Sequence, residues 1–89
     1  MITFDEGKRA KTLAERGLDF VDAAKVFAGH HFTRPDERKE YGEPRFITIG
    51  RLAGRFVVVT WTPRDGGWRI ISMRCGHERE EDRFRHHLG

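Results

Sequence analysis

The feature that most constrains the fold is a run of β-branched and aromatic residues at positions 55–62, RFVVVTWT. Residues of these types favour an extended strand packed within a sheet. Ala53-Gly54 before the run predicts a tight turn, and the composition of residues 63–67, PRDGG, predicts another turn after it. Strands are expected on both sides, at 46–52 and 68–73. The second half of the chain therefore predicts an antiparallel meander.

The first half of the chain has a helical period instead. Asp5 is a candidate N-cap for a helix that Gly17 is placed to end. The apolar residues of this helix recur at i, i+3 and i+4, which predicts an apolar stripe of Ala10, Leu13 and Ala14. A second, shorter helix is expected to start at Asp19 or Asp22 and to end before Gly29.

The remaining segments complete an α+β pattern. Residues 30–44 contain two prolines and a charged run, which predicts a loop with an edge strand around His31–Arg34. Residues 78–87 are expected to form a C-terminal helix. The order predicts a two-layer sandwich of two N-terminal helices, an antiparallel sheet of three or four strands and the C-terminal helix, with the helices on one face. No linker or repeat divides the chain, so residues 1–89 are expected to form a single domain.

Composition excludes several classes of protein. Cys75 is the only cysteine in the sequence, so no internal disulfide forms and an oxidising compartment is not implied. No apolar run approaches the roughly 20 residues that cross a bilayer, and the N-terminus lacks the apolar stretch of a signal peptide. We therefore expect a cytoplasmic protein with no membrane partner. His30-His31 has no further ligand at zinc spacing, so neither a metal site nor a cofactor is expected.

The net charge of +3 hides an asymmetry along the chain. Between Arg45 and His77 there are six arginines, no lysine and one acidic residue, Asp65. A guanidinium can bind phosphate through two parallel hydrogen bonds, so arginine suits the recognition of a polyanion better than lysine does. This segment predicts a surface that binds nucleic acid, most simply RNA.

A series of short motifs spans nearly the whole chain in order. They are Phe4-Asp5 with Lys8, Leu13, GLDF (17–20), Ala23 and Phe27, RKEYGEPR (38–45), ITIG (47–50), Arg64, RIISMR (69–74) and a charged helix with Glu80. In this combination the sequence resembles the BrnT family, the ribonuclease half of a type II toxin–antitoxin pair. The resemblance implies a RelE-like fold and metal-independent RNA cleavage. It also implies neutralisation by a ribbon-helix-helix antitoxin, BrnA, in a complex that binds its own operator DNA.

The chain departs from the family pattern at several positions. A Lys-His pair commonly precedes the first glycine, and a Lys-Ala pair commonly follows RIISMR. The residues that differ from the usual ones are Thr12 in place of Asn, Glu15-Arg16 in place of Lys-His, Cys75-Gly76 in place of Lys-Ala, and Phe84 in place of Tyr.

A ribonuclease without a metal must deprotonate the 2′-hydroxyl, stabilise charge on the phosphorane and protonate the leaving 5′-oxygen. Arg64, Arg69 and Arg74 are the leading candidates for phosphate contacts. In a regular strand Arg69 and Arg74 differ in parity and face opposite sides, although alternation can lapse at the strand end. Glu43 is the candidate base, unless its pair with Arg45 is structural. His77 is a candidate acid.

Other residues are candidates for RNA binding without chemistry. Arg45, Arg51 and Arg55 belong to the basic segment, while Tyr41 and Trp68 can stack bases. Trp61, in the middle of a strand, is interpreted as a core residue, and Cys75 as an inert thiol. Two other functions stay open: a catalytically inactive partner of an antitoxin that binds RNA or operator DNA, and a scaffold whose basic face docks an acidic helix.

Overall fold

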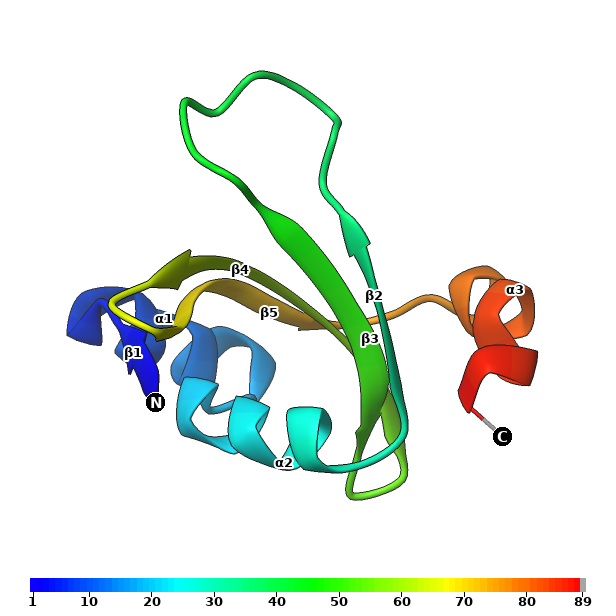
Figure 1. Ribbon diagram of the computed structural model, residues 1–89. Coiled ribbons are helices and arrows are strands. Elements are labelled where there is room, and N and C mark those ends of the chain that lie inside the picture. Colours follow the sequence, from blue (N-terminus) through cyan, green and yellow to red (C-terminus); the bar gives the residue numbers. More distant parts are fainter. Residues whose placement is uncertain (89) are drawn as a thin grey trace.

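The computed structural model describes residues 1–88, with side chains described as far as residue 86. Its centre is a five-stranded sheet in the order β1-β5-β4-β3-β2 (Figure 1). The strands are β1 (Ile2–Phe4), β2 (His31–Pro35), β3 (Phe46–Leu52), β4 (Arg55–Arg64) and β5 (Gly67–Cys75). All neighbouring strands are antiparallel except β1 and β5, which are parallel. The α+β class and the edge strand β2 are therefore confirmed.

The prediction of a purely antiparallel sheet with three or four strands is wrong, because β1 was missed. Three residues are too few to show a strand period, and pairing with a strand more than sixty residues away leaves no local signal. The Trp68 N–H donates to the Met1 carbonyl at 2.8 Å, which joins the two strands at their starts. A side chain at Gly67 would collide with the Met1 backbone, so glycine permits this close approach.

The turn between β4 and β5 is shorter than expected. Both strands continue into the predicted turn segment, and only Asp65 and Gly66 have positive φ angles, of 53° and 77°. Ala53 and Gly54 form a similar two-residue turn between β3 and β4, with φ angles of 51° and 80°. Two-residue turns with positive φ match the right-handed twist of the flanking strands.

The helices begin where the capping residues predict. In α1 (Glu6–Arg16) the Asp5 carboxylate accepts from the Lys8 N–H at 2.9 Å, and Gly17 ends the helix with φ 67°. Asp19 accepts from the Val21 N–H and starts a short 3₁₀ turn, η1 (Phe20–Asp22). The helix α2 (Ala23–Ala28) follows without a side-chain cap, and α3 (Glu78–Leu88) closes the chain.

The larger core lies between α2 and one face of the sheet, called here the helix face. The segment after α1 supplies Leu18 and Phe20 to this core, and α2 supplies Ala23 and Val26. They pack against sheet residues that are also buried: Val57, Val59, Ile70 and Met73. In contrast to the predicted stripe, α1 has no buried residue, and Leu13 is 46% exposed.

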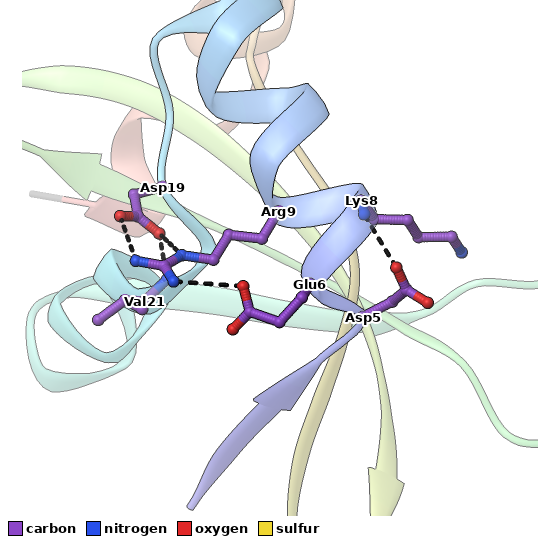
Figure 2. Close-up of polar contacts among 6 residues, drawn as sticks. All are labelled: Asp5, Glu6, Lys8, Arg9, Asp19 and Val21. Carbon is purple, nitrogen blue, oxygen red and sulfur yellow. Dashed lines mark hydrogen bonds and ion pairs between the residues drawn. The ribbon is translucent and has the colours of Figure 1, made fainter.

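A fork of hydrogen bonds fastens α1 to η1 (Figure 2). The Arg9 guanidinium donates to both carboxylate oxygens of Asp19, at 2.8 and 3.2 Å, and contacts Glu6 at 3.4 Å. Since α1 contributes little apolar burial, these polar contacts hold its start against the core segment that follows it.

The opposite face of the sheet has its own apolar cluster, made by Ile47, Ile49, Phe56 and Val58. Phe84 of α3 packs against this cluster and stacks on Phe32 with ring centres 5.7 Å apart. The prediction that all helices lie on one face is therefore wrong, and Figure 1 shows α3 set apart from the other helices. The reason is that β3 and β4 have apolar residues at consecutive positions, so apolar side chains point to both faces of the sheet. Both faces must therefore be covered by other elements.

Candidate active site on the arginine face

A β-bulge determines which side chains share a face of the sheet. Along β4, Thr62 is paired with Arg69 and Val58 with Arg74, and the register shifts between these pairs. Ile71 is the extra residue of β5, with no partner on β4. Because of this one-residue insertion, Arg69 and Arg74 lie on the same face despite their opposite parity. The alternation of side chains therefore lapses, as the sequence allowed, but at a bulge inside β5 and not at the end of the strand.

This face, opposite α2, is called here the arginine face. Cross-strand partners share a face, so the register places on it Arg34, Arg51, Arg64, Arg69 and Arg74. Arg55 is on the other face, where its Nη2 donates to the Cys75 sulfur at 2.9 Å. The basic segment of the sequence therefore folds with most of its guanidinium groups on one side.

The first hollow of the arginine face, called here the Glu43 hollow, has a volume of about 190 Å³. Glu43, Arg45, Arg64 and Arg69 line it together with Lys8 of α1. The Glu43 carboxylate lies between two guanidiniums, with Oε2 3.3 Å from Arg45 Nε and Oε1 3.6 Å from Arg64 Nη2. The structure thus brings together four residues that the sequence singled out for chemistry or RNA binding.

The loop that carries Glu43 is anchored to the sheet. The Thr62 hydroxyl donates to the Pro44 carbonyl at 2.6 Å, and the Asp36 N–H donates to the Arg45 carbonyl at 2.8 Å. These bonds extend the ladder of β2, β3 and β4 into the loop. Glu43 therefore has a defined position although it lies outside regular structure.

The second hollow, called here the Arg74 hollow, has a volume of about 270 Å³. Its floor is apolar, from Ile47, Ile49 and Val58, and its rim carries the guanidiniums of Arg34, Arg38 and Arg74. Thr60 and Ser72 line the same hollow and are cross-strand partners on β4 and β5. They lie between Arg74 and the pair of Thr62 and Arg69, so the two hollows follow each other along the same strands.

Arg74 is already paired with a carboxylate. Its Nη1 and Nη2 donate to the two oxygens of Glu80, at 2.8 and 2.9 Å. The hydrogen bonds from Arg74, together with the one from the His77 N–H, lower the pKa of Glu80 to about 2. Glu80 thereby caps the start of α3 and joins the helix to the sheet.

The other predicted site residues are dispersed. The Arg45 guanidinium lies over the Tyr41 ring at 4.0 Å from its centre, and Arg51 pairs with Glu81 of α3 at 2.7 Å. His77 precedes α3, does not line the Glu43 hollow and contacts Glu80 through its backbone.

Trp68 lies on the helix face, away from the arginine face. It stacks on Phe27 with ring centres 5.1 Å apart and lines an apolar pocket there. Trp61 belongs to the same aromatic group, and its Nε1–H donates to the buried Thr48 hydroxyl at 2.8 Å. Both tryptophans are therefore partly buried packing residues.

Sequence reasoning missed three basic residues that line the hollows, namely Lys8, Arg34 and Arg38. They belong to the first half of the chain, where acidic and basic residues nearly balance, so composition gave no signal. Among the described side chains, no group of three or more His, Cys, Asp or Glu residues is arranged to hold a metal. No helix in the described part of the chain is long and apolar enough to span a membrane.

Fold and surface together define a small α+β protein with an arginine-rich sheet face, on which a carboxylate is set among guanidiniums. The sequence model of the family described as "Ribonuclease toxin, BrnT, of type II toxin-antitoxin system" matches residues 4–80. The chain therefore belongs to the BrnT family of ribonuclease toxins. A comparison with curated proteins found no significant match.

Proposed function

We propose that this toxin cleaves RNA without a metal ion, by attack of a 2′-hydroxyl on the adjacent phosphate. The product is a 2′,3′-cyclic phosphate and a free 5′-hydroxyl. The observation that carries this proposal is the position of the Glu43 carboxylate between Arg45 and Arg64, in a hollow that Arg69 also lines. A proton acceptor beside several phosphate-binding groups can perform two of the three tasks of this reaction, deprotonation of the 2′-hydroxyl and stabilisation of charge on the phosphorane.

Four residues of the hollow have roles in the proposed reaction. Glu43 accepts the 2′-hydroxyl proton while the bond from that oxygen to phosphorus forms. Arg64 and Arg69 contact the non-bridging oxygens, where negative charge increases. The bond from phosphorus to the 5′-oxygen then breaks, and Lys8 at the rim of the same hollow protonates this oxygen. Lys8 takes this role because His77 does not line the hollow. DNA lacks the attacking hydroxyl, so RNA is the substrate.

The test is cleavage of labelled RNA in the presence of EDTA, with analysis of the fragment ends. The wild-type chain is expected to give 2′,3′-cyclic phosphate ends. Loss of a general base lowers such rates by about 100-fold or more, so Glu43→Gln should nearly abolish cleavage. Arg55→Ala, on the helix face, is the matched control and should retain the wild-type rate. Wild-type cleavage by Glu43→Gln would remove Glu43 from the mechanism.

Two observations favour a second function, a catalytically inactive protein that binds RNA or operator DNA. Arg74 is already engaged by Glu80, and Phe84 offers the Arg74 hollow no hydroxyl where the family usually carries tyrosine. This function predicts RNA that is retarded on a gel and stays intact under the same conditions.

The family implies an antitoxin as partner. We assign this role to a ribbon-helix-helix protein like BrnA, and we propose that only the complex of toxin and antitoxin binds operator DNA. We further propose that the toxin domain has a RelE-like fold and that both proteins act in the cytoplasm. A partner that binds only the folded toxin stabilises it by about 2.7 kcal/mol at a hundred times its Kd. The melting temperature of the toxin should therefore rise when the antitoxin is added, and no change would count against this partner.

A further inference from the structure

A third hollow lies within the loop between β2 and β3, which projects beyond the sheet in Figure 1. Its volume is about 510 Å³, and residues 35–37, 39–41 and 43–46 line it. Glu43 and Arg45 line both this loop hollow and the Glu43 hollow. The proposed general base and its arginine partner thus form the wall between the phosphate site and a neighbouring space large enough for a nucleobase.

Polar contacts around one buried carboxylate hold the loop that surrounds this hollow. The Asp36 side chain is fully buried, and its carboxylate accepts from Arg38 Nε at 2.7 Å and Arg38 Nη2 at 2.8 Å. The Asp36 backbone joins Arg45, and Gly42 takes the positive φ of 74° that the turn requires. The bond between Asp36 and Arg45 joins the two sides of the loop at its base, and the Asp36–Arg38 pair fixes the chain where it enters the loop.

One wall of the loop hollow is formed by a stacked pair. The Arg45 guanidinium lies over one face of the half-buried Tyr41 ring, 4.0 Å from its centre, so a base can stack on the outer surface of this pair. Aromatic rings and guanidinium planes are the surfaces on which proteins stack single-stranded RNA bases. The Lys39 ammonium lies 5.2 Å from the same ring centre, at the end of an exposed and flexible side chain that a base can move aside.

The polar groups of the rim match one base in particular. Glu37 and Glu40 are exposed carboxylates, and within the described part of the chain neither makes an ion pair or side-chain hydrogen bond. Guanine presents two adjacent N–H donors, N1–H and the N2 amino group, which a carboxylate binds through both oxygens. Its O6 and N7 are acceptors that a lysine such as Lys39 can bind. Adenine, cytosine and uracil do not present that pair of donors beside an acceptor.

From this geometry we infer that the loop hollow binds a guanine base next to the scissile phosphate. The base stacks on the wall of Tyr41 and Arg45, and Glu37 or Glu40 accepts its N–H groups. This inference rests on the proposed ribonuclease function, because the bound guanine would then determine which phosphate of the RNA is cut.

The experiment compares the wild-type chain with the double variant Glu37→Gln/Glu40→Gln in two assays. The first is cleavage of a mixed-sequence RNA in EDTA, with the bases on both sides of each cut identified. The second is calorimetric binding of each of the four nucleoside 3′-monophosphates. Glu78→Gln is the matched control, because it removes an exposed carboxylate at the start of α3, outside the loop hollow.

The wild-type chain and Glu78→Gln should cut beside guanine and bind guanosine 3′-monophosphate about tenfold more tightly than the other three. The double variant should lose this preference and still cut RNA. Cleavage without base preference, or a guanine preference that survives in the double variant, overturns the inference and leaves the ribonuclease proposal intact. If RNA is not cut at all, selective guanosine binding that the double variant loses still supports the guanine site. Equal binding of all four nucleotides overturns it.

Discussion

Gly76 stands where the resemblance to the BrnT family leads us to expect alanine. A methyl group on Gly76 would collide with the Phe56 ring, which belongs to the apolar cluster under α3. The Gly76 N–H also donates to the Phe56 carbonyl at 3.0 Å, which keeps the backbone close to that ring. This departure from the family is therefore a packing match between two residues of the chain.

Gly76→Ala is accordingly expected to lower the free energy of unfolding by about 1–3 kcal/mol, the usual cost of overpacking a core. Urea denaturation measures this change. Gly29→Ala is the matched control, because a Cβ there meets its nearest atom at 3.7 Å, and its effect should stay within about 0.5 kcal/mol. In a Phe56→Leu background Gly76→Ala should cost less, since the two residues are in contact. An equal cost with and without the Phe56 ring would contradict this account.

At the scale of elements, much of the fold could be predicted from local chemistry. The limits of β3, the start and end of α1 and the edge strand β2 agree with the strand runs, caps and turn residues of the sequence. The predictions that failed concerned contacts between residues far apart in the sequence. The pairing of β1 with β5, and the placement of α3 on the arginine face, are decided by which surfaces remain uncovered after the other elements have packed.

The same limit applies to the candidate site. The sequence located Glu43, Arg45, Arg64 and Arg69 as chemically interesting, and they line one hollow. It could not reveal the bulge at Ile71, because a bulge is a property of the register between two strands. Nor could it reveal that Trp68 points to the helix face, since a single strand gives the alternation of its side chains but not which face is covered.

The loop between β2 and β3 is an element fastened by one buried acid, so its stability should depend on pH. Hydrogen bonds from Arg38 lower the pKa of Asp36 from 3.8 to about 2. Because the pKa in the folded state lies below the ordinary value, Asp36 contributes stability that is fully present above about pH 4 and is lost as the pH falls toward 2. The contribution is about 1–2 kcal/mol, reduced by the exposure of Arg38.

Asp36→Asn should therefore lower the free energy of unfolding at pH 7 and should lose less stability than the wild-type chain between pH 4 and pH 2. Urea denaturation at several pH values measures both effects. Some acid dependence should remain in the variant, because the pKa of Glu80 is also lowered to about 2. Glu37→Gln, an exposed neighbour, should leave the pH profile unchanged. A parallel loss of stability in the Asp36→Asn and wild-type chains would show that Asp36 does not fasten the loop.

At the scale of the whole molecule, the two faces of the sheet differ in charge and in the elements that cover them. The helix face is covered by α2 and the segment before it, over the larger core, whereas the arginine face presents its hollows beside α3. RNA binding on the arginine face should release counterions in proportion to the number of phosphates contacted. Contacts from Arg45, Arg64, Arg69 and Arg74 would give a slope of log K against log salt of about −3 for a single strand.

The two faces can be separated by comparing one arginine from each. Arg69→Ala should reduce the magnitude of the salt slope by about 0.7, since one phosphate contact is lost. Arg55→Ala removes the same charge from the chain but from the helix face, where its guanidinium contacts Cys75, so the slope should not change. Fluorescence anisotropy with a labelled RNA, titrated at several salt concentrations, measures both slopes. If the two substitutions reduce the slope equally, binding depends on net charge alone, and the arginine face is not the RNA site.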